Sequence, residues 1–386
     1  MALVLNPEQS MLQQSARDFL NRQAPVKHLR GLRDAGGNKG FSPEVWAEMS
    51  ALGWPAVAVP EEYGGLGFGF TGLGIVLQET GRTLTPCPLL SSAMMAVAAL
   101  LRAGTAAQKS ALLPGIASGE STATLAFDEQ SQHRPAQVKA SAERTADGFC
   151  LNGQKRLVLD GAMSDQLIVS ARTDDKAPAG KAQVSDKDRI SLFIIPASTP
   201  GVAITPCQVL DTHVLADITL DDVHLPADAL LGAENQGGAI LDYALDAGRI
   251  GQCAELLGVA LEAFERTIAY LKERKQFGVP IGSFQALQHR AAVLFGELEM
   301  CKSLVLNALH RLDSDDQEIA ATASMTKVKL AETADKVTAE AIQWHGGIGM
   351  TDEFEIGFFY KRARILETLL GDRYFHLNRF ARQRGY

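Results

Sequence analysis

The sequence predicts an α+β protein with three successive parts: an N-terminal helical domain, a middle β-barrel and a C-terminal four-helix bundle. Two changes in the spacing of apolar residues indicate this order. Residues 1–121 and 236–386 carry apolar side chains at helical spacing, whereas residues 122–235 consist of short alternating or β-branched segments. A chain of 386 residues is long enough for three such domains.

The N-terminal domain is expected to contain short capped helices. In Asn6-Pro-Glu-Gln9 a capping asparagine precedes a proline and a glutamine, and Ser42-Pro43 repeats the start of this pattern. Gly67-Phe-Gly-Phe-Thr-Gly72 matches the glycine pattern of dinucleotide-binding folds. That pattern belongs between a strand and a helix, and here a loop precedes it, so we reject NAD binding. Helices are expected over residues 9–22, 42–52, 72–81, 89–103 and 105–118.

The middle part has the strand spacing of a β-barrel or sandwich of about a hundred residues. Asp147-Gly148 and Asn152-Gly153 are typical of two-residue hairpin turns, so each is expected to connect two strands. The charged stretch 173–188 contains Gly and Pro and is expected to be a mobile loop. Strands are expected over residues 122–127, 136–144, 149–159, 166–172, 190–196, 202–206 and 213–220.

The C-terminal part is expected to be an antiparallel bundle, because four long segments each carry an apolar face. These segments span residues 238–272, 284–312, 316–344 and 354–370. The third runs into Gln343-Trp-His-Gly-Gly-Ile-Gly349, where three glycines would let backbone amides approach a bulky anionic ligand. A glycine that caps the end of a helix is the alternative interpretation of this stretch.

Composition narrows the function classes. The net charge of −8 argues against a nucleic-acid partner and against an anionic membrane surface. Five cysteines are scattered without the spacing of a zinc site, which favours reduced thiols, no bound metal and a cytoplasmic protein. The first residues carry no basic segment of a signal peptide, and no apolar run is long enough for membrane insertion.

Four ordered motifs resemble those of the acyl-CoA dehydrogenase family. The most specific is Arg274-Lys-Gln-Phe-Gly-Val-Pro-Ile-Gly-Ser-Phe-Gln285, which is similar to the family signature Arg-x-Gln-Phe-Gly-x-Pro-Ile-x-x-Phe-Gln. The other three are Asn152-Gly-Gln-Lys155, Leu220-Asp-Asp-Val-His-Leu-Pro226 and the glycine stretch after Gln343. The resemblance covers the whole chain. It implies the family fold and a tetrameric, FAD-dependent oxidoreductase of fatty acid degradation that desaturates an acyl-CoA thioester.

The resemblance also implies site residues. In the family, FAD lies across a subunit interface, so part of each site is supplied by the neighbouring subunit. Arg274 would face the pyrophosphate of the neighbour's FAD, as a fixed cation with several donors suits. The other residues of this site would be Gln276, Phe284, Gln285, Gln343, Gly346 and Gly347. A surface ion pair is the alternative role for Arg274.

Arg249 matches the family arginine at the start of the long helix that borders the acyl-CoA site. The alternative is a salt bridge on the helix surface with Asp246, three residues earlier.

Two positions depart from the family where it delivers the catalytic base. The usual acidic residue before a glycine is replaced by Leu370, and the position used by some members, just before the long-helix arginine, is Gly248. The nearest carboxylates are Asp372, two residues late, and Glu367, nearly one helical turn early. Both are more typical of helix ends or surfaces than of a base, and Asp372 is kept as the candidate.

The flavin-facing segments of the middle domain also differ from the family. The Thr-Glu-Pro segment with its Gly-Ser turn corresponds here to residues 126–133, Ala-Phe-Asp-Glu-Gln-Ser-Gln-His. The Trp-Ile-Thr-Asn-Gly segment corresponds to Leu157-Val-Leu-Asp-Gly161. The aromatic plate and the threonine hydroxyl are therefore both absent.

Three hypotheses follow. In the first, the chain resembles the small subunit of two-component members such as pimeloyl-CoA dehydrogenase, and a paralogous large subunit supplies the base in a heterotetramer. Acyl-CoA and electron-transfer flavoprotein would be its other partners. In the second, a self-sufficient homotetramer uses Asp372. In the third, the chain is a catalytically silent structural subunit that binds acyl-CoA or FAD. By analogy the acyl group would be branched, dicarboxylic or steroid-derived.

Overall fold

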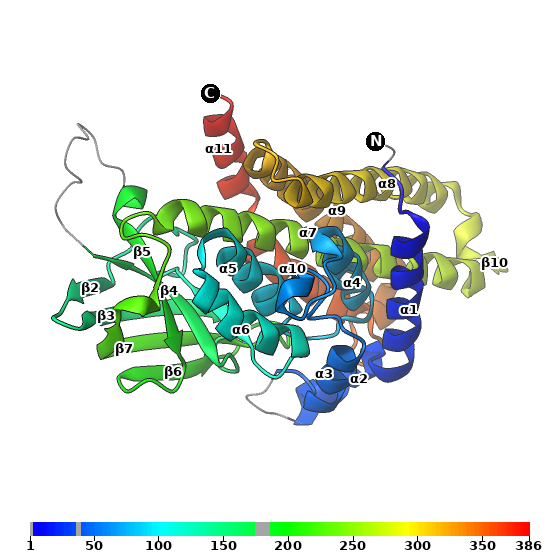
Figure 1. The fold of residues 1–386 in the computed structure, drawn as a ribbon. Coiled ribbons are helices and arrows are strands. Elements are labelled where there is room, and N and C mark those ends of the chain that lie inside the picture. Colours follow the sequence, from blue (N-terminus) through cyan, green and yellow to red (C-terminus); the bar gives the residue numbers. More distant parts are fainter. Residues whose placement is uncertain (1–2, 36–39, 174–185) are drawn as a thin grey trace. The chain divides into compact units, whose positions relative to one another are not determined.

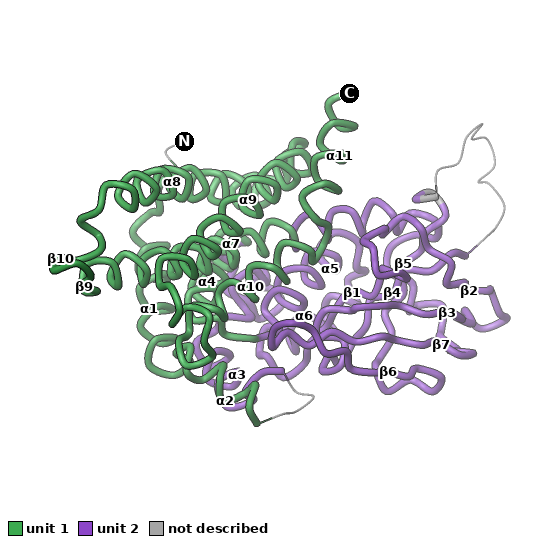
Figure 2. The backbone as a smooth tube through the Cα atoms, turned by 180° about the vertical axis from the view of Figure 1, so that it is seen from behind, with its two compact units in different colours: residues 1–35, 70–86, 249–386 green, residues 36–69, 87–248 purple. Residues whose placement is uncertain are grey.

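The structure is a computed structural model that describes residues 3–35, 40–173 and 186–386. Its contacts divide the chain into two compact units (Figure 2). Unit 1 comprises residues 1–35, 70–86 and 249–386, and unit 2 comprises residues 36–69 and 87–248. The architecture of an N-terminal helical part, a middle sheet and a C-terminal helical part is confirmed (Figure 1). Three separate domains with boundaries near residues 121 and 235 stay a proposal.

Unit 1 is helical. Within it α9 packs against α8, α10 and α11. Its helices are α1 (Pro7–Gln23), α2 (Val26–Ala35), α4 (Gly69–Thr83, with its first residue in unit 2), α8 (Gln285–Asp313), α9 (Ile319–His345), α10 (Ile356–Thr368) and α11 (Arg373–Gln383). The long helix α7 (Gly237–Glu273) runs through both units. A two-stranded hairpin of β9 (Lys275–Gln276) and β10 (Val279–Pro280) joins α7 to α8.

The first helix begins where its cap predicts. Asn6 Oδ1 accepts a hydrogen bond from the Gln9 amide at 2.8 Å, and Gln9 Oε1 accepts one from the Asn6 amide at 3.0 Å. In α9 the buried positions Leu330, Ala334, Val337 and Ala341 recur every three to four residues, which explains why this helix lies at the centre of its bundle.

Unit 2 is built on an eight-stranded sheet in the order β6-β7-β3-β2-β4-β5-β8, with β1 paired in parallel to β4. In the described residues the end strands β6 and β8 do not pair with each other, so the word sheet fits better than closed barrel. The strands are β1 (Ala123–Ala126), β2 (Ser141–Arg144), β3 (Gly148–Leu159), β4 (Gln166–Arg172), β5 (Ile190–Pro196), β6 (Val202–Cys207), β7 (Leu215–Pro226) and β8 (Leu230–Leu231). The helices of this unit are α3 (Pro43–Ala51), a π-helical segment (Leu89–Ala96), α5 (Val97–Ala103) and α6 (Ala106–Ser118).

One of the two predicted hairpin turns is wrong. The turn at Asp147-Gly148 joins β2 to β3 as expected. Asn152-Gly153 instead lies inside β3, at a shift of register against β7. The Asn152 amide group bonds across to Asp222, with Nδ2–Oδ1 at 3.1 Å, and Gly153 takes a φ of +149°. The dipeptide therefore forms a bulge, which needs the same backbone freedom as a turn.

Two helices were not expected from the sequence, α2 and α11. The Gly67–Gly72 stretch lies after a short 3-10 turn, and no strand precedes it in the described residues. Most of the loop expected over residues 173–188 lies outside the described residues. No described helix combines the length and the apolar character needed to cross a membrane.

Candidate active site

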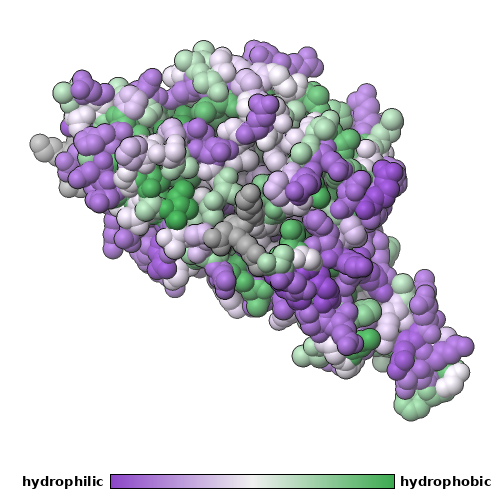
Figure 3. All heavy atoms as spheres, turned by 90° about the horizontal axis from the view of Figure 1, so that it is seen from below, coloured by the Kyte–Doolittle hydropathy of each residue, from purple (hydrophilic) through white to green (hydrophobic). Residues whose placement is uncertain are grey.

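The expected FAD-binding residues gather at one end of unit 1. Arg274, Gln276, Phe284 and Gln285 are all exposed. Phe277, at the tip of the β9–β10 hairpin, is 92% exposed and has a φ of +51°. In Figure 3 hydrophobic residues lie among hydrophilic ones at the end of the molecule that carries this hairpin. An exposed aromatic side chain on a strained turn indicates a surface that a ligand or a second subunit covers.

The structure brings this hairpin to the glycine stretch that follows α9. Tyr270, one turn before Arg274, stacks on His345 with ring centroids 4.3 Å apart. The Tyr270 hydroxyl also donates to the His345 carbonyl oxygen at 3.4 Å. The two sequence stretches expected to form one site therefore meet at the C-terminal ends of α7 and α9.

The glycines of this stretch leave room for a ligand. Gly346 is the C-cap of α9 with a φ of +66°, so the capping interpretation holds for that residue. Gly347 has no positive φ, and apart from its sequence neighbours no atom of the described residues lies within 4 Å of a Cβ atom added there. Packing within the chain does not require this glycine, whereas the close approach of a bulky cofactor would. This end of unit 1 is therefore open to a bulky ligand such as the expected FAD.

Leu370 occupies the expected position of the base. It follows the end of α10, is 3% exposed and has a φ of +59°, a conformation that costs a non-glycine residue about 1–2 kcal/mol. Its carbonyl oxygen accepts hydrogen bonds from Arg249 Nε and His376 Nε2, each at 3.1 Å. Two hydrogen bonds thus hold the strained backbone at Leu370, although the leucine side chain cannot accept a proton.

The neighbouring carboxylates have other partners. Asp372 is the N-cap of α11, and its Oδ1 accepts from the Phe375 amide at 2.8 Å. Glu367 forms an ion pair with Arg364 at 2.6 Å. Gly248 lies within α7. Arg249 is only 1% exposed, so it does not lie on a solvent-facing surface of α7.

Sequence reasoning missed a buried lysine beside this turn. Lys327 on α9 is fully buried and donates from Nζ to the carbonyl oxygens of Leu366 and Leu369, the latter at 2.9 Å, and to Gln252 Oε1. Burial lowers the pKa of Lys327 to about 7. The available signal was a lysine on the same helical face as Leu330 and Ala334.

Ion pairs and hydrogen bonds fix the loop at residues 126–133, which corresponds to the expected flavin-facing segment of unit 2. The fully buried Lys155 donates to Glu129 Oε1 at 2.7 Å and to Ser170 Oγ at 3.0 Å. Glu129 also accepts from the amides of two residues further along the chain, Lys139 and Ala140. Asp128 stands 2.7 Å from His133 Nδ1. Both carboxylates are therefore occupied within the loop.

The second flavin-facing segment contains a bulge. Leu157 has a φ of +53° and is 37% exposed, at a break in the pairing of β3 with β7. Its amide donates to Asp217 Oδ1 at 3.0 Å, and Arg156 Nε donates to the same carboxylate at 3.2 Å. The segment offers neither an aromatic plate at Leu157 nor a hydroxyl at Leu159, so this face does not fit a flavin ring.

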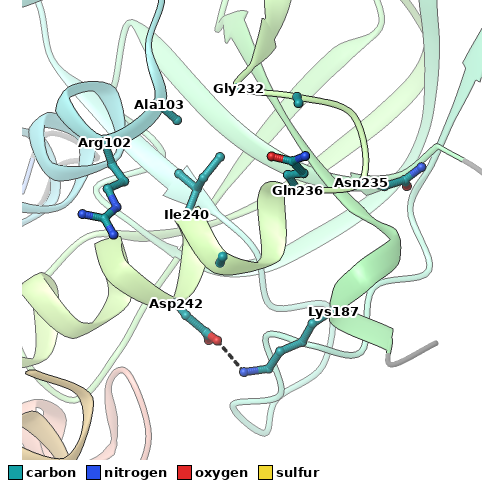
Figure 4. A pocket seen from close by; sticks show the side chains of 10 residues that line it. Arg102, Ala103, Lys187, Gly232, Asn235, Gln236, Ile240 and Asp242 are labelled. Atoms are coloured by element: carbon teal, nitrogen blue, oxygen red, sulfur yellow. Dashed lines mark hydrogen bonds and ion pairs between the residues drawn. The ribbon is translucent and has the colours of Figure 1, made fainter. Parts of the chain in front are cut away.

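Unit 2 also contains a cavity of about 770 Å³ at the start of α7 (Figure 4). Arg102, at the end of α5, and Lys187 reach it from opposite sides of the first turns of α7, and the amide side chains of Asn235 and Gln236 come from the preceding loop. Lys187 forms an ion pair with Asp242. The Arg102 guanidinium lies 4.8 Å from the centre of the Tyr243 ring. The lining combines positive charge, amide donors and small apolar side chains.

Three family models match consecutive parts of the chain. They are the N-terminal, middle and C-terminal domains of acyl-CoA dehydrogenase, over residues 6–120, 126–223 and 235–384. The chain belongs to the acyl-CoA dehydrogenase family. This family consists of flavoproteins that typically bind FAD, and the chain is an oxidoreductase of this type.

Relatives of this acyl-CoA dehydrogenase share about a third of its sequence. Probable acyl-CoA dehydrogenase YngJ of Bacillus subtilis is 31% identical over 369 residues, which are 94% of each chain. Acyl-CoA dehydrogenase FadE12 of Mycobacterium tuberculosis is 32% identical over 335 residues, covering 83% of this chain and 82% of the relative. Butyryl-CoA dehydrogenase from Megasphaera elsdenii has a similar structure, with a TM-score of 0.90, 25% identity and 99% coverage of each chain.

Proposed function

We propose that this acyl-CoA dehydrogenase is the small subunit of a two-component enzyme, related in role to the small subunit of pimeloyl-CoA dehydrogenase. A paralogous large subunit supplies the base and the main flavin face, and the two form a cytoplasmic heterotetramer that desaturates acyl-CoA during the breakdown of fatty acids. The observation that carries the proposal is the buried Leu370 at the position of the base.

The absence of a base at the expected positions favours a two-component enzyme over a self-sufficient one. Desaturation requires a group that takes the α-proton within hydrogen-bond reach. Asp372 is the remaining candidate, but one of its carboxylate oxygens already caps α11. The loop at Glu129 and the bulge at Leu157 likewise weigh against a flavin bound by this chain alone.

The intact end of unit 1 supports a role toward the partner's cofactor. Arg274 would hold the FAD pyrophosphate of the neighbouring subunit, with Gln276, Phe284 and Gln285 beside it and Gln343, Gly346 and Gly347 completing the site. FAD itself supplies the acceptor for the hydride. The exposed Phe277 and the open turn at Gly347 serve no packing role within the chain. Their presence favours a cofactor-binding role over a purely structural one.

The cavity at the start of α7 supports a CoA thioester as the ligand. The nucleotide end of CoA carries several phosphate charges, which cations, amides and a helix N-terminus bind well. Arg102 and Lys187 provide the positive charge, and Gln236 provides amide donors. The volume of about 770 Å³ lies in the usual range for small-molecule sites. The role of Arg249 at the border of the acyl-CoA site stays a separate expectation from the family resemblance.

Two relatives support the partners. One similar structure is a Tcur3481-Tcur3483 steroid ACAD variant, with a TM-score of 0.86, 30% identity and 97% coverage of each chain. A 29% identical relative in Acetobacterium woodii is a caffeyl-CoA reductase-Etf complex subunit, CarC. The first protein favours a second subunit as partner. The second favours an electron-transfer flavoprotein.

Activity with and without the paralogue tests the proposal. The chain is purified alone and together with a paralogous subunit, each preparation is reconstituted with FAD, and turnover of an acyl-CoA panel is measured with an artificial electron acceptor. We expect turnover and flavin absorbance only in the complex. Turnover by the chain alone that disappears in Asp372→Asn would replace the proposal with a self-sufficient enzyme. Absence of both turnover and acyl-CoA binding in the complex would leave a structural subunit.

A further inference from the structure

The glycine turn that follows α9, Gly346–Met350, has little packing of its own. Residues 346–353 are exposed except for Gly349. The turn begins directly after His345, which is buried at the end of α9. Burial therefore fixes the start of the turn, whereas the position of its end depends on the contacts of residues 351–355, which lead to α10.

One carboxylate connects that segment to α2. Arg33 Nη1 donates to Asp352 Oδ1 at 2.6 Å, and Arg33 Nη2 donates to Asp352 Oδ2 at 2.8 Å. Arg30 Nη1 donates to the same Oδ2 at 2.9 Å. The hydrogen bonds from Arg33, more than any other contact, lower the pKa of Asp352 to about 2. The carboxylate is therefore charged at neutral pH and is held by two cations at once.

Both arginines are oriented before they meet the carboxylate. Their guanidinium carbon atoms lie 4.8 Å (Arg30) and 5.1 Å (Arg33) from the centre of the ring of Phe358, which is buried in α10. Arg33 Nε donates to Asp34 at 2.8 Å, which leaves its two Nη atoms for Asp352. An exposed ion pair usually contributes little because long side chains lose freedom, but a bidentate arginine on a fixed platform loses less of it.

A short path of contacts connects Asp352 to the glycine turn. The preceding residue, Thr351, donates from its amide and from Oγ1 to the carbonyl oxygen of Ile348, at 3.1 and 2.8 Å. Ile348 directly follows Gly347 in the chain. A displacement of Asp352 would therefore be passed through Thr351 and Ile348 to Gly346 and Gly347, whose backbone is expected to lie against FAD.

We propose that Asp352 is a positioning residue for the cofactor: held by Arg30 and Arg33, it keeps the glycine turn in the conformation that admits FAD. The helix α2 thereby contributes to FAD binding through the turn. The inference rests on the proposed FAD-binding role of this end of unit 1. None of these three residues belongs to the motifs that resemble the family.

FAD affinity in two matched variants tests the inference. Asp352→Asn keeps the shape of the side chain and removes its charge. Glu318→Gln is the control, because it breaks an exposed ion pair with Arg384 at the opposite end of α9. The FAD dissociation constant is measured by flavin fluorescence in the complex with the paralogous subunit. We expect Asp352→Asn to raise this constant about 2- to 5-fold, the effect of one exposed ion pair, and Glu318→Gln to leave it unchanged.

Two further measurements separate positioning from a general effect on stability. Arg33→Gln should also weaken FAD binding, and the double variant should bind FAD no more weakly than Asp352→Asn alone, because both changes remove the same contact. In the flavin-free protein, amide hydrogen exchange in the peptide 346–351 should be faster in Asp352→Asn than in the wild type and unchanged in Glu318→Gln.

Three results would overturn the inference and leave the proposed function intact: an unchanged FAD affinity in Asp352→Asn, additive losses in the double variant, or unchanged exchange in the glycine turn. An equal loss of FAD affinity in Asp352→Asn and Glu318→Gln would also overturn it, since it would assign the effect to stability. Failure of the wild-type complex to bind FAD would reject the proposed function and the inference together.

Discussion

The side chain of Arg249 is fixed to the main chain of Leu370, with Nε 3.1 Å from the carbonyl oxygen. His376 donates to the same oxygen, and Lys327 holds the carbonyls one and four residues earlier. These contacts keep Leu370 in a left-handed conformation that leucine does not favour. The position expected for the base is therefore held in one backbone conformation and carries an apolar side chain.

Leu370→Glu is therefore expected to add a base. The turn is already held, so a glutamate there should reach the position from which the family removes the α-proton. In the FAD-loaded complex with the paralogous subunit we expect turnover at the site that contains residue 370 to rise by about 10²–10⁴-fold, the usual value of general-base catalysis. Leu370→Gln is the matched control, since it has nearly the same shape and cannot accept the proton. Equal rates for the two variants would show that residue 370 does not face the substrate.

Buried His376 should make the folded protein sensitive to acid. Burial, and then the charges of Arg249 and Lys327, lower the pKa of His376 in the folded state, while an unfolded imidazole has a pKa of about 6.5. Below that pH the unfolded chain binds a proton that the folded chain does not. The free energy of unfolding should therefore fall with pH below about 6.5, by up to about 1.4 kcal/mol per pH unit from this residue.

Urea titrations between pH 8 and pH 5 measure this effect. His376→Gln serves as the comparison, because its amide can still donate to the Leu370 carbonyl oxygen and stays neutral in both states. The wild type should lose stability more steeply than the variant. Parallel curves for the two proteins would contradict a neutral buried His376.

Arg274→Ala is expected to weaken FAD retention. The exposed guanidinium is placed at the end of α7 beside the open glycine turn, and a hydrogen bond to a charged group is worth about 1.5–3 kcal/mol. Flavin content and the FAD dissociation constant are measured in whichever assembly binds FAD. Lys272→Ala, an exposed cation two residues earlier, controls for the general loss of charge. An unchanged FAD affinity in Arg274→Ala would reject its proposed role.

The exposed apolar face of α8 is expected to be a subunit interface. Val293, Phe295 and Met300 are each at least half exposed, and Val293 and Met300 are seven residues apart on one helical face. We expect light scattering at micromolar concentration to give a dimer or tetramer. Val293→Glu with Met300→Glu should shift the protein toward monomer, whereas Val4→Glu, at a similarly exposed valine before α1, should not. A monomeric wild type would contradict the proposed assembly.

Local signals in the sequence were sufficient for most of the fold. The cap at Asn6 defines the start of α1, and strands β4 and β5 have the predicted bounds because alternating and β-branched residues end at clear turn signals. Asn152-Gly153 was misassigned because a hairpin and a bulge require the same local freedom, and the distant partner Asp222 decides between them. Such a partner cannot be identified from neighbouring residues.

The candidate site was less accessible to sequence reasoning. The motif around Arg274 and the glycines after Gln343 could be named from sequence, but their meeting depends on the stacking of Tyr270 on His345. Lys327 was missed because its partners are carbonyl oxygens about 40 residues away, and main-chain groups leave no mark in a sequence. Asp372 stays a predicted candidate for the base, and its role as the cap of α11 could not be read from the residue count alone.

Glu129→Gln tests whether the flavin-facing loop is held by a buried charge pair. Lys155 is fully buried, burial lowers its pKa, and Glu129 stands 2.7 Å from its ammonium group. Removal of one partner leaves an uncompensated charge in the sheet, which typically costs about 3–5 kcal/mol. Urea unfolding should show a loss of this size for Glu129→Gln. Adding Lys155→Met should recover much of the lost stability, because the double variant buries no charge.

Glu234→Gln, which breaks the exposed pair with Arg144, is the control and should cost less than about 1 kcal/mol. Equal losses for the buried and exposed pairs would mean that Lys155 is neutral in the folded protein and that hydrogen bonds, rather than charge, fix the loop.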